Sequence, residues 1–154
     1  MLQRIHSLYW LGAIICLSFL NFGLDVFRFE TKDAVYEFDF YSVVKFVNNK
    51  AVSEKTIWIY PASIFVTLLI SVVIFLFKNL KTQLNLSNRI KFGITFLFII
   101  ITTNAYLGVF VSNPKSVVFG SGYYLMLLAI IFTYLASWSV KKDKKLLDSV
   151  DRIR

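Results

Sequence analysis

Residues 121–140 read SGYYLMLLAIIFTYLASWSV, and residues 141–154 read KKDKKLLDSVDRIR. The first stretch is an uncharged apolar run of about twenty residues, which is long enough for a helix to cross the hydrocarbon core of a bilayer. The second stretch is rich in lysine and arginine, as the cytoplasmic side of a membrane protein usually is. The boundary between them therefore predicts a membrane-spanning helix followed by a cytoplasmic tail.

The composition of the whole chain agrees with a membrane protein. Of its 154 residues, 57% are hydrophobic, and 16 phenylalanines and 8 tyrosines are among them. A soluble domain of this size would have to bury apolar runs longer than its core helices usually contain. The single cysteine, Cys16, permits neither an internal disulfide nor a cysteine-based zinc cluster. We expect one integral membrane domain over residues 1–154.

Three further apolar runs precede the last one. The four predicted spans are about 7–24, 58–77, 92–111 and 121–140, separated by an outer loop (25–57) and a cytoplasmic loop (78–91) and followed by the tail (141–154). The fold class predicted from them is an all-α membrane protein, a four-transmembrane-helix bundle with a small extracytoplasmic β-hairpin in the first outer loop.

The first run has a rival interpretation as a signal peptide, because Arg4 precedes an apolar stretch. The run is long, however, and it is followed by NFGLDVF (21–27), which contains no small-x-small cleavage site. A lipoprotein signal ending at Cys16 would need a small residue before it, and Ile15 is not small. We therefore expect a retained first span.

The outer loop has the pattern of a hairpin. FRF (27–29) and VYEFDF (35–40) alternate aromatic with charged residues, and TKDA (31–34) supplies a polar turn. YSVVKFVNNK (41–50) suggests a short amphipathic helix. Because an isolated hairpin is marginal in water, its aromatic face should lie on the membrane, on the helix ends or on a partner. The candidate partner-binding residues are Phe27, Phe29, Tyr36, Phe38 and Phe40.

The charges divide unequally between the two predicted sides. The termini and loop 78–91 together hold eleven Lys/Arg against three Asp, whereas the other side holds six cations and six acids. The positive-inside rule then places both termini in the cytoplasm of a bacterial inner membrane. Anionic lipids account for this charge without nucleic acid, at about 1 kcal/mol per cation. The candidate lipid headgroup contacts are Lys78, Lys81, Arg89, Lys91, Lys141 and Lys142.

The spans show no set of residues for chemistry. No ionisable residue lies deep within any of them, which argues against a proton-coupled multidrug exporter, and one cysteine argues against a quinone-linked disulfide enzyme. We expect no catalytic residue, cofactor or metal. We expect His6 to lie at the membrane interface with no second histidine or acid nearby. Asn21 and Asn104 are interpreted as intramembrane polar packing between helices, with a ligand or pore contact as the alternative for Asn104.

The tail has two interpretations. Leu146, Leu147, Val150 and Ile153 recur at helical spacing, and Lys144 and Arg152 each lie four residues from Asp148. Such a segment either lies on the membrane surface or docks on a cytoplasmic partner. Both remain open from the sequence.

The two ends of the chain together resemble a known family. MLQRIHSLYWLGAII (1–15) and SWSVKKDKKLLDSVDRIR (137–154) are similar to an uncharacterised bacterial family of small four-span inner-membrane proteins, domain-of-unknown-function family 4293. The similarity extends across the chain and is clearest in the tail. The resemblance implies a fold and a location, and it implies no activity.

These observations favour a non-enzymatic accessory or scaffolding subunit of a larger inner-membrane complex, with membrane lipids and other membrane proteins as partners. The main alternative is a small oligomeric transporter or channel without titratable groups in the membrane. A membrane enzyme ranks third.

Overall fold

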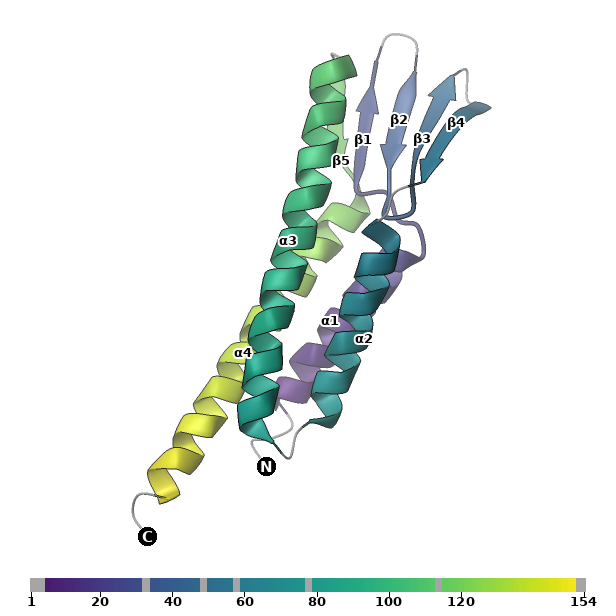
Figure 1. Cartoon of the computed structure of the whole chain (residues 1–154). Coiled ribbons are helices and arrows are strands. Elements are labelled where there is room, and N and C mark those ends of the chain that lie inside the picture. Colours follow the sequence, from purple (N-terminus) through teal and green to yellow (C-terminus); the bar gives the residue numbers. More distant parts are fainter. Residues whose placement is uncertain are drawn as a thin grey trace.

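The computed structural model of the chain describes residues 5–31, 34–47, 50–56, 59–76, 79–112 and 115–151. Within these residues, helices stand side by side and a sheet lies at one end of them (Figure 1). The helices are α1 (Ile5–Asn21), α2 (Ile59–Phe75), α3 (Leu80–Ser112) and α4 (Ser121–Asp151). The strands are β1 (Phe27–Glu30), β2 (Val35–Phe38), β3 (Ser42–Val47), β4 (Lys50–Thr56) and β5 (Ser116–Phe119).

The prediction of an all-α four-transmembrane-helix bundle is wrong. The described residues form four helices together with a five-stranded antiparallel sheet. Only Leu80–Leu107 and Ser121–Leu147 among them are helices both long and apolar enough to cross a membrane, whereas α1 and α2 are shorter apolar helices. The sequence predicts only the hairpin of β1 and β2, because strands of four to seven residues give weak sequence patterns. β3, β4 and β5 depend on pairing with neighbouring strands, which local sequence does not reveal.

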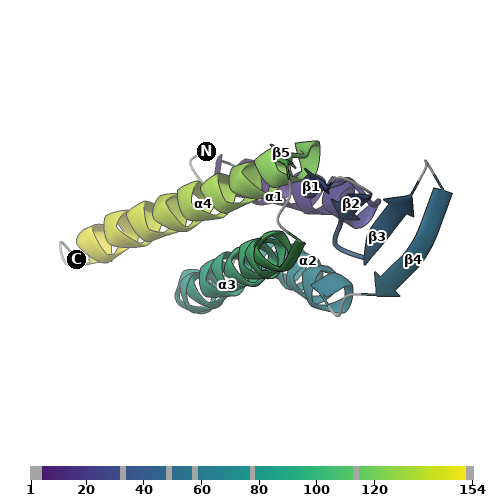
Figure 2. The same cartoon turned by 90° about the horizontal axis from the view of Figure 1, so that it is seen from above.

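The helices bury apolar side chains of all sizes against one another, from Ala13 to Trp10, and they also expose large apolar ones. α1 packs most extensively on α4, and the two run side by side in both views (Figures 1 and 2). Their contact is close: a Cβ atom at Gly12 would lie 3.2 Å from the ring of Phe132. Leu8, Phe65, Phe92 and Trp138, one from each helix, are exposed. Exposed apolar side chains on every helix are consistent with a location in a membrane.

Two predicted segments differ from the structure. The predicted cytoplasmic loop 78–91 is helical from Leu80 onward, and Gln83, Ser87 and Ile90 in it are buried. Gln83, Ser87, Ile90 and Ile94 lie on one face of the helix, and all four are buried. The buried face of α3 therefore begins well before the predicted span. The predicted amphipathic helix at 41–50 is instead β3 and the start of β4. Its β-branched and aromatic residues favour a strand once β2 is available for pairing.

The predicted hairpin is present as β1 and β2, although it forms only part of the sheet. The strand order is β4-β3-β2-β1-β5, so β1 lies between its hairpin partner and a strand that follows α3 in the chain. Phe27 pairs with Phe38 and with Phe119, while Arg28 pairs with Glu37 and forms an ion pair of 2.5 Å with it. Because side chains alternate across a strand, the aromatic and charged residues of β1 lie on opposite faces.

Gly120 and Gly122 join the sheet to the helices. The N–H of Gly120 donates to the carbonyl of Val26 at 2.9 Å, and the N–H of Gly122 donates to the carbonyl of Asp25 at 3.0 Å. A Cβ atom at Gly120 would lie 2.1 Å from the Asp25 carbonyl oxygen, and one at Gly122 would lie 2.9 Å from it. This close backbone contact fixes the start of α4 against the connection from α1 to β1.

We expect Gly120→Ala to destabilise the protein by about 2–3 kcal/mol, because the backbone of residue 25 would have to move to admit a methyl group. The control is Gly93→Ala, where the nearest atom, Val66 Cγ2, lies at 3.8 Å and leaves room for the methyl group. Thermal unfolding in detergent micelles measures both. Equal unfolding midpoints for the two variants would contradict the steric role of Gly120.

Candidate functional site

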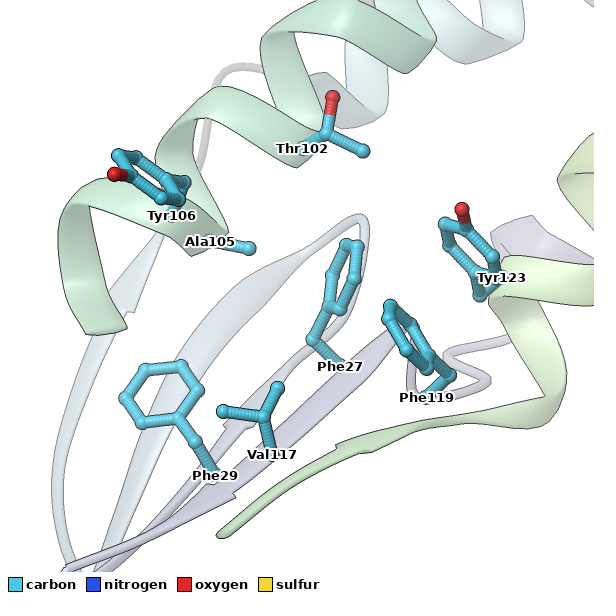
Figure 3. Close-up of a pocket in the computed structure, with 8 residues that line it drawn as sticks. All are labelled: Phe27, Phe29, Thr102, Ala105, Tyr106, Val117, Phe119 and Tyr123. Atoms are coloured by element: carbon cyan, nitrogen blue, oxygen red, sulfur yellow. The ribbon is translucent and has the colours of Figure 1, made fainter. Parts of the chain in front are cut away.

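A pocket of about 270 Å³ lies between α3 and the sheet (Figure 3). Phe27, Phe29, Val117 and Phe119 enter it from the same face of β1 and β5, where Phe27 pairs with Phe119 and Phe29 with Val117. α3 and the start of α4 form the opposite wall. The lining residues are Phe27, Phe29, Thr102, Ala105, Tyr106, Val117, Phe119 and Tyr123.

Aromatic rings from three elements fix the shape of the pocket. The rings of Phe27, Phe119 and Tyr123 contact one another, with centroid separations of 5.6 Å for Phe27–Phe119, 5.3 Å for Phe27–Tyr123 and 4.8 Å for Phe119–Tyr123. Tyr123 also contacts Phe98 of α3 at 5.7 Å. Tilted ring pairs at these distances attract one another beyond their burial. Tyr123 therefore connects β1, β5, α3 and α4.

The pocket has little polar chemistry. The hydroxyl of Thr102 donates within its own helix, to the carbonyls of Phe98 and Ile99. Tyr106 and Tyr123 supply the other side-chain oxygens in the lining, and neither an acid, a base nor a thiol is among the lining residues. Among the described residues, no group of three or more His, Cys, Asp or Glu is arranged to hold a metal ion. An apolar guest fits this pocket best.

The predicted partner-binding aromatics lie mostly inside the fold. Phe27, Phe29, Phe38 and Phe40 are buried, and Tyr36 is half-buried and stacks on Phe29 at 5.2 Å. Phe27 and Phe29 line the pocket. β5 and Tyr123 were missed by sequence reasoning, because SVVF (116–119) is short and lies in a turn-rich connection.

The side chains of β5 are exposed beside the pocket. Ser116, Val117, Val118 and Phe119 are all exposed, and the strand pairs only with β1 among the described strands. Gly120 and Val26 form a hydrogen-bonded pair between β5 and β1. Because hydrogen-bonded and non-hydrogen-bonded pairs alternate along antiparallel strands, the N–H and C=O groups of residues 117 and 119 point away from β1. The outer edge of β5 therefore offers a short row of backbone donors and acceptors next to an apolar pocket.

At the opposite end of the helices, His6 meets an acid that the sequence did not suggest. Its Nδ1 lies 3.4 Å from Oδ2 of Asp143 on α4, and His6 is 0% exposed. The expectation that His6 has no acid nearby is thus wrong, because antiparallel packing of α1 on α4 joins two positions far apart in the sequence. Asp143 is also buried, so this pair closes the lower end of the α1–α4 contact.

Other buried polar groups lie at this end of the bundle. Gln83 of α3 donates through Nε2 to the carbonyl of Val73 at 3.2 Å, and the hydroxyls of Ser87 and Ser137 are 2.7 Å apart. The Nε1 of Trp10, the Oε1 of Gln83 and both ring nitrogens of His6 have no hydrogen-bond partner among the described residues. The two hydrogen bonds join α3 to α2 and to α4, and satisfied polar contacts of this kind in a low-dielectric interior hold helices in one register.

The two predicted packing asparagines behave differently. Asn21 accepts a hydrogen bond from the hydroxyl of Ser63 and so connects α1 to α2. Asn104 is exposed, and its Nδ2 donates to the carbonyl of Ile100 on its own helix at 2.8 Å. Of the two asparagines, Asn21 is therefore the one whose described hydrogen bond joins two helices.

The predicted basic and tail residues lie at the end away from the sheet. Lys81, Arg89, Lys141 and Lys142 are exposed and Lys91 is half-buried, while Lys78 lies outside the described residues. The tail continues α4 without a break to Asp151, and Leu146 and Leu147 on it are exposed. The side chain of Val150 is not described, and Ile153 lies outside the described residues.

We expect His6 and Asp143 to be energetically coupled. A cycle of His6→Gln, Asp143→Asn and the double variant should give a coupling free energy of about 1–3 kcal/mol, because each single change leaves the other buried group without its partner. Unfolding of the four proteins in a detergent series measures it. Additive effects would show that the two side chains are neighbours without a stabilising interaction.

Comparison with known proteins agrees with the resemblance seen at the two ends of the sequence. No curated protein matches the chain. Residues 2–153 match the family described as domain of unknown function (DUF4293). Because this match extends over nearly the whole chain, the protein belongs to that family.

Proposed function

We propose that the protein is a four-span protein of the bacterial inner membrane with both termini in the cytoplasm. All four helices expose apolar side chains, among them Leu11, Leu68, Phe96 and Ile131. At 17 residues, α1 and α2 are each about 25 Å long, which is close to the thickness of the hydrocarbon core. The excess of cations at the end away from the sheet supports the orientation.

Cysteine labelling tests this orientation. In a Cys16→Ser background, Lys45→Cys on β3 should react with an impermeant maleimide in intact spheroplasts. Asn85→Cys, exposed near the start of α3, should react only after the membrane is opened. Labelling of Asn85→Cys alone in intact spheroplasts would reverse the topology.

We infer that its function is that of a non-enzymatic accessory or scaffolding subunit, and that the outer edge of β5 is where a partner docks. The observation that supports this best is the free edge of β5 directly beside the apolar pocket. An extended segment of a partner membrane protein would add a strand to the edge through main-chain hydrogen bonds. Every second side chain of that segment would point to the same side as Val117 and Phe119.

The chemistry of the pocket favours binding over catalysis. An aromatic-lined hollow without a carboxylate, an imidazole, an amine or a thiol in its described lining gives apolar contact area and shape. An exposed edge strand with apolar side chains is also a surface that a protein usually covers. A partner that pairs with β5 and inserts an apolar side chain would cover both features together.

Site-specific photo-cross-linking tests the docking surface. A benzoylphenylalanine in place of Phe119 should cross-link one discrete membrane protein in native membranes, whereas the same group in place of Tyr41 on the β2–β3 connection should not. The two positions are a matched pair, because each side chain is 50% exposed. Equal products from both positions would contradict docking at β5.

A second change separates strand addition from simple proximity. Val117→Pro removes a backbone N–H directed at the free edge and keeps the pairs of Val118 with Arg28 and of Gly120 with Val26. It should abolish the cross-link from position 119 while the protein remains folded in detergent. A cross-link that joins two copies of this chain would favour the oligomeric transporter or channel instead.

A further inference from the structure

Two neighbouring hollows lie at the end away from the sheet, one between α3 and α4 and the other along α4 alone. The first has a volume of about 300 Å³ and is lined by Leu84, Asn88, Lys91, Tyr134, Ser137, Trp138 and Lys141. The second, of about 350 Å³, is lined by Trp138, Lys141, Lys142 and Lys145. Trp138 and Lys141 belong to both, and Trp138 is 66% exposed. An exposed tryptophan between lysines is typical of the membrane–water interface.

Lysines are the charged residues in the described lining of both hollows. The Nζ of Lys91 lies 5.3 Å from the ring centroid of Tyr134, and the Nζ of Lys142 lies 5.9 Å from that of Trp138. Among the side chains that the structure describes, no Asp or Glu lines either hollow. Asp143, the acid nearest in sequence, is buried on the other side of α4 against His6. The described lining of the hollows is therefore positively charged, and two of its ammonium groups lie over aromatic rings.

The same face of α4 is apolar towards the middle of the bundle. Tyr134 and Ile131 lie one and two turns before Trp138, and both are exposed. A ligand seated at Trp138 thus meets lysines at one end and an apolar helix face at the other. This arrangement matches an amphiphile with an anionic head and a hydrocarbon tail, and it does not match a small soluble anion.

We propose that the hollow between Lys91 and Lys141 binds the headgroup of an acidic phospholipid. Lys91 and Lys141 contact the phosphate, Asn88 offers its side-chain amide to headgroup hydroxyls, and an acyl chain lies along Tyr134 and Ile131. Basic pockets between transmembrane helices on the cytoplasmic side are suited to such lipids. The proposal rests on the membrane placement above and is independent of the docking role of β5.

Native mass spectrometry of the detergent-solubilised chain tests it with dioleoylphosphatidylglycerol as the probe. We expect the wild type to retain this lipid in preference to dioleoylphosphatidylcholine. Lys91→Gln with Lys141→Gln should bind it about thirtyfold more weakly, the ratio expected for two interfacial cations. The matched control is Lys50→Gln with Lys115→Gln, which removes the same charge from exposed positions outside both hollows. The control should bind within twofold of the wild type.

Three results would overturn the proposal. Equal losses in the two double variants would show diffuse attraction to basic residues instead of a site. Equal retention of phosphatidylcholine would show that the hollow does not select anionic lipid. Competition by millimolar glycerol phosphate, which has the headgroup without the chains, would identify a soluble anion as the ligand. None of these results depends on whether β5 has a protein partner, so the two proposals can fail separately.

Discussion

The contact of Gly120 and Gly122 with the backbone of residue 25 is the constraint on which the arrangement of the sheet depends. The strand before Gly120 pairs with β1, and the helix after it packs along α1. Because α1 leads into β1 and β5 leads into α4, the two connections cross at one point, where only a hydrogen atom fits between them. A side chain at position 120 would separate β5 from β1 or α4 from α1. The pocket between α3 and the sheet exists because β5 is held against β1 while α4 is held against α1.

The helices could be predicted from the sequence, while much of the sheet could not. Apolar runs of about twenty residues have few alternatives to a helix, so each predicted span contains most of one. Tyr41–Lys50 is different, because its pattern fits either a helix or a strand until β2 provides a partner. β5 has only four residues and pairs with a strand more than eighty positions earlier. No local pattern encodes that pairing, and the same reason hid the contact between His6 and Asp143.

The site could be predicted in part. Alternation identified Phe27 and Phe29 as one aromatic face, and they line the pocket. What that face covers could not be predicted, since the opposite wall comes from α3 and from Tyr123 at the start of α4. The lysines at the other end were assigned to lipid from their charge alone. Their grouping around Trp138 depends on α3 beginning at Leu80, because the added turns supply Leu84 and Asn88 to the hollow.

α4 is a single helix of 31 residues from Ser121 to Asp151, and so it measures about 46 Å. One end begins directly after the edge strand and the other projects beyond the bundle as a basic arm (Figure 1). A rod of this kind acts as a lever: a tilt of about 10° displaces one end by about 8 Å relative to the other. Its pivot would lie where Gly12 admits the ring of Phe132. A change of position at the sheet end of α4 would thereby become a change of position at its basic end, with no rearrangement inside the helix.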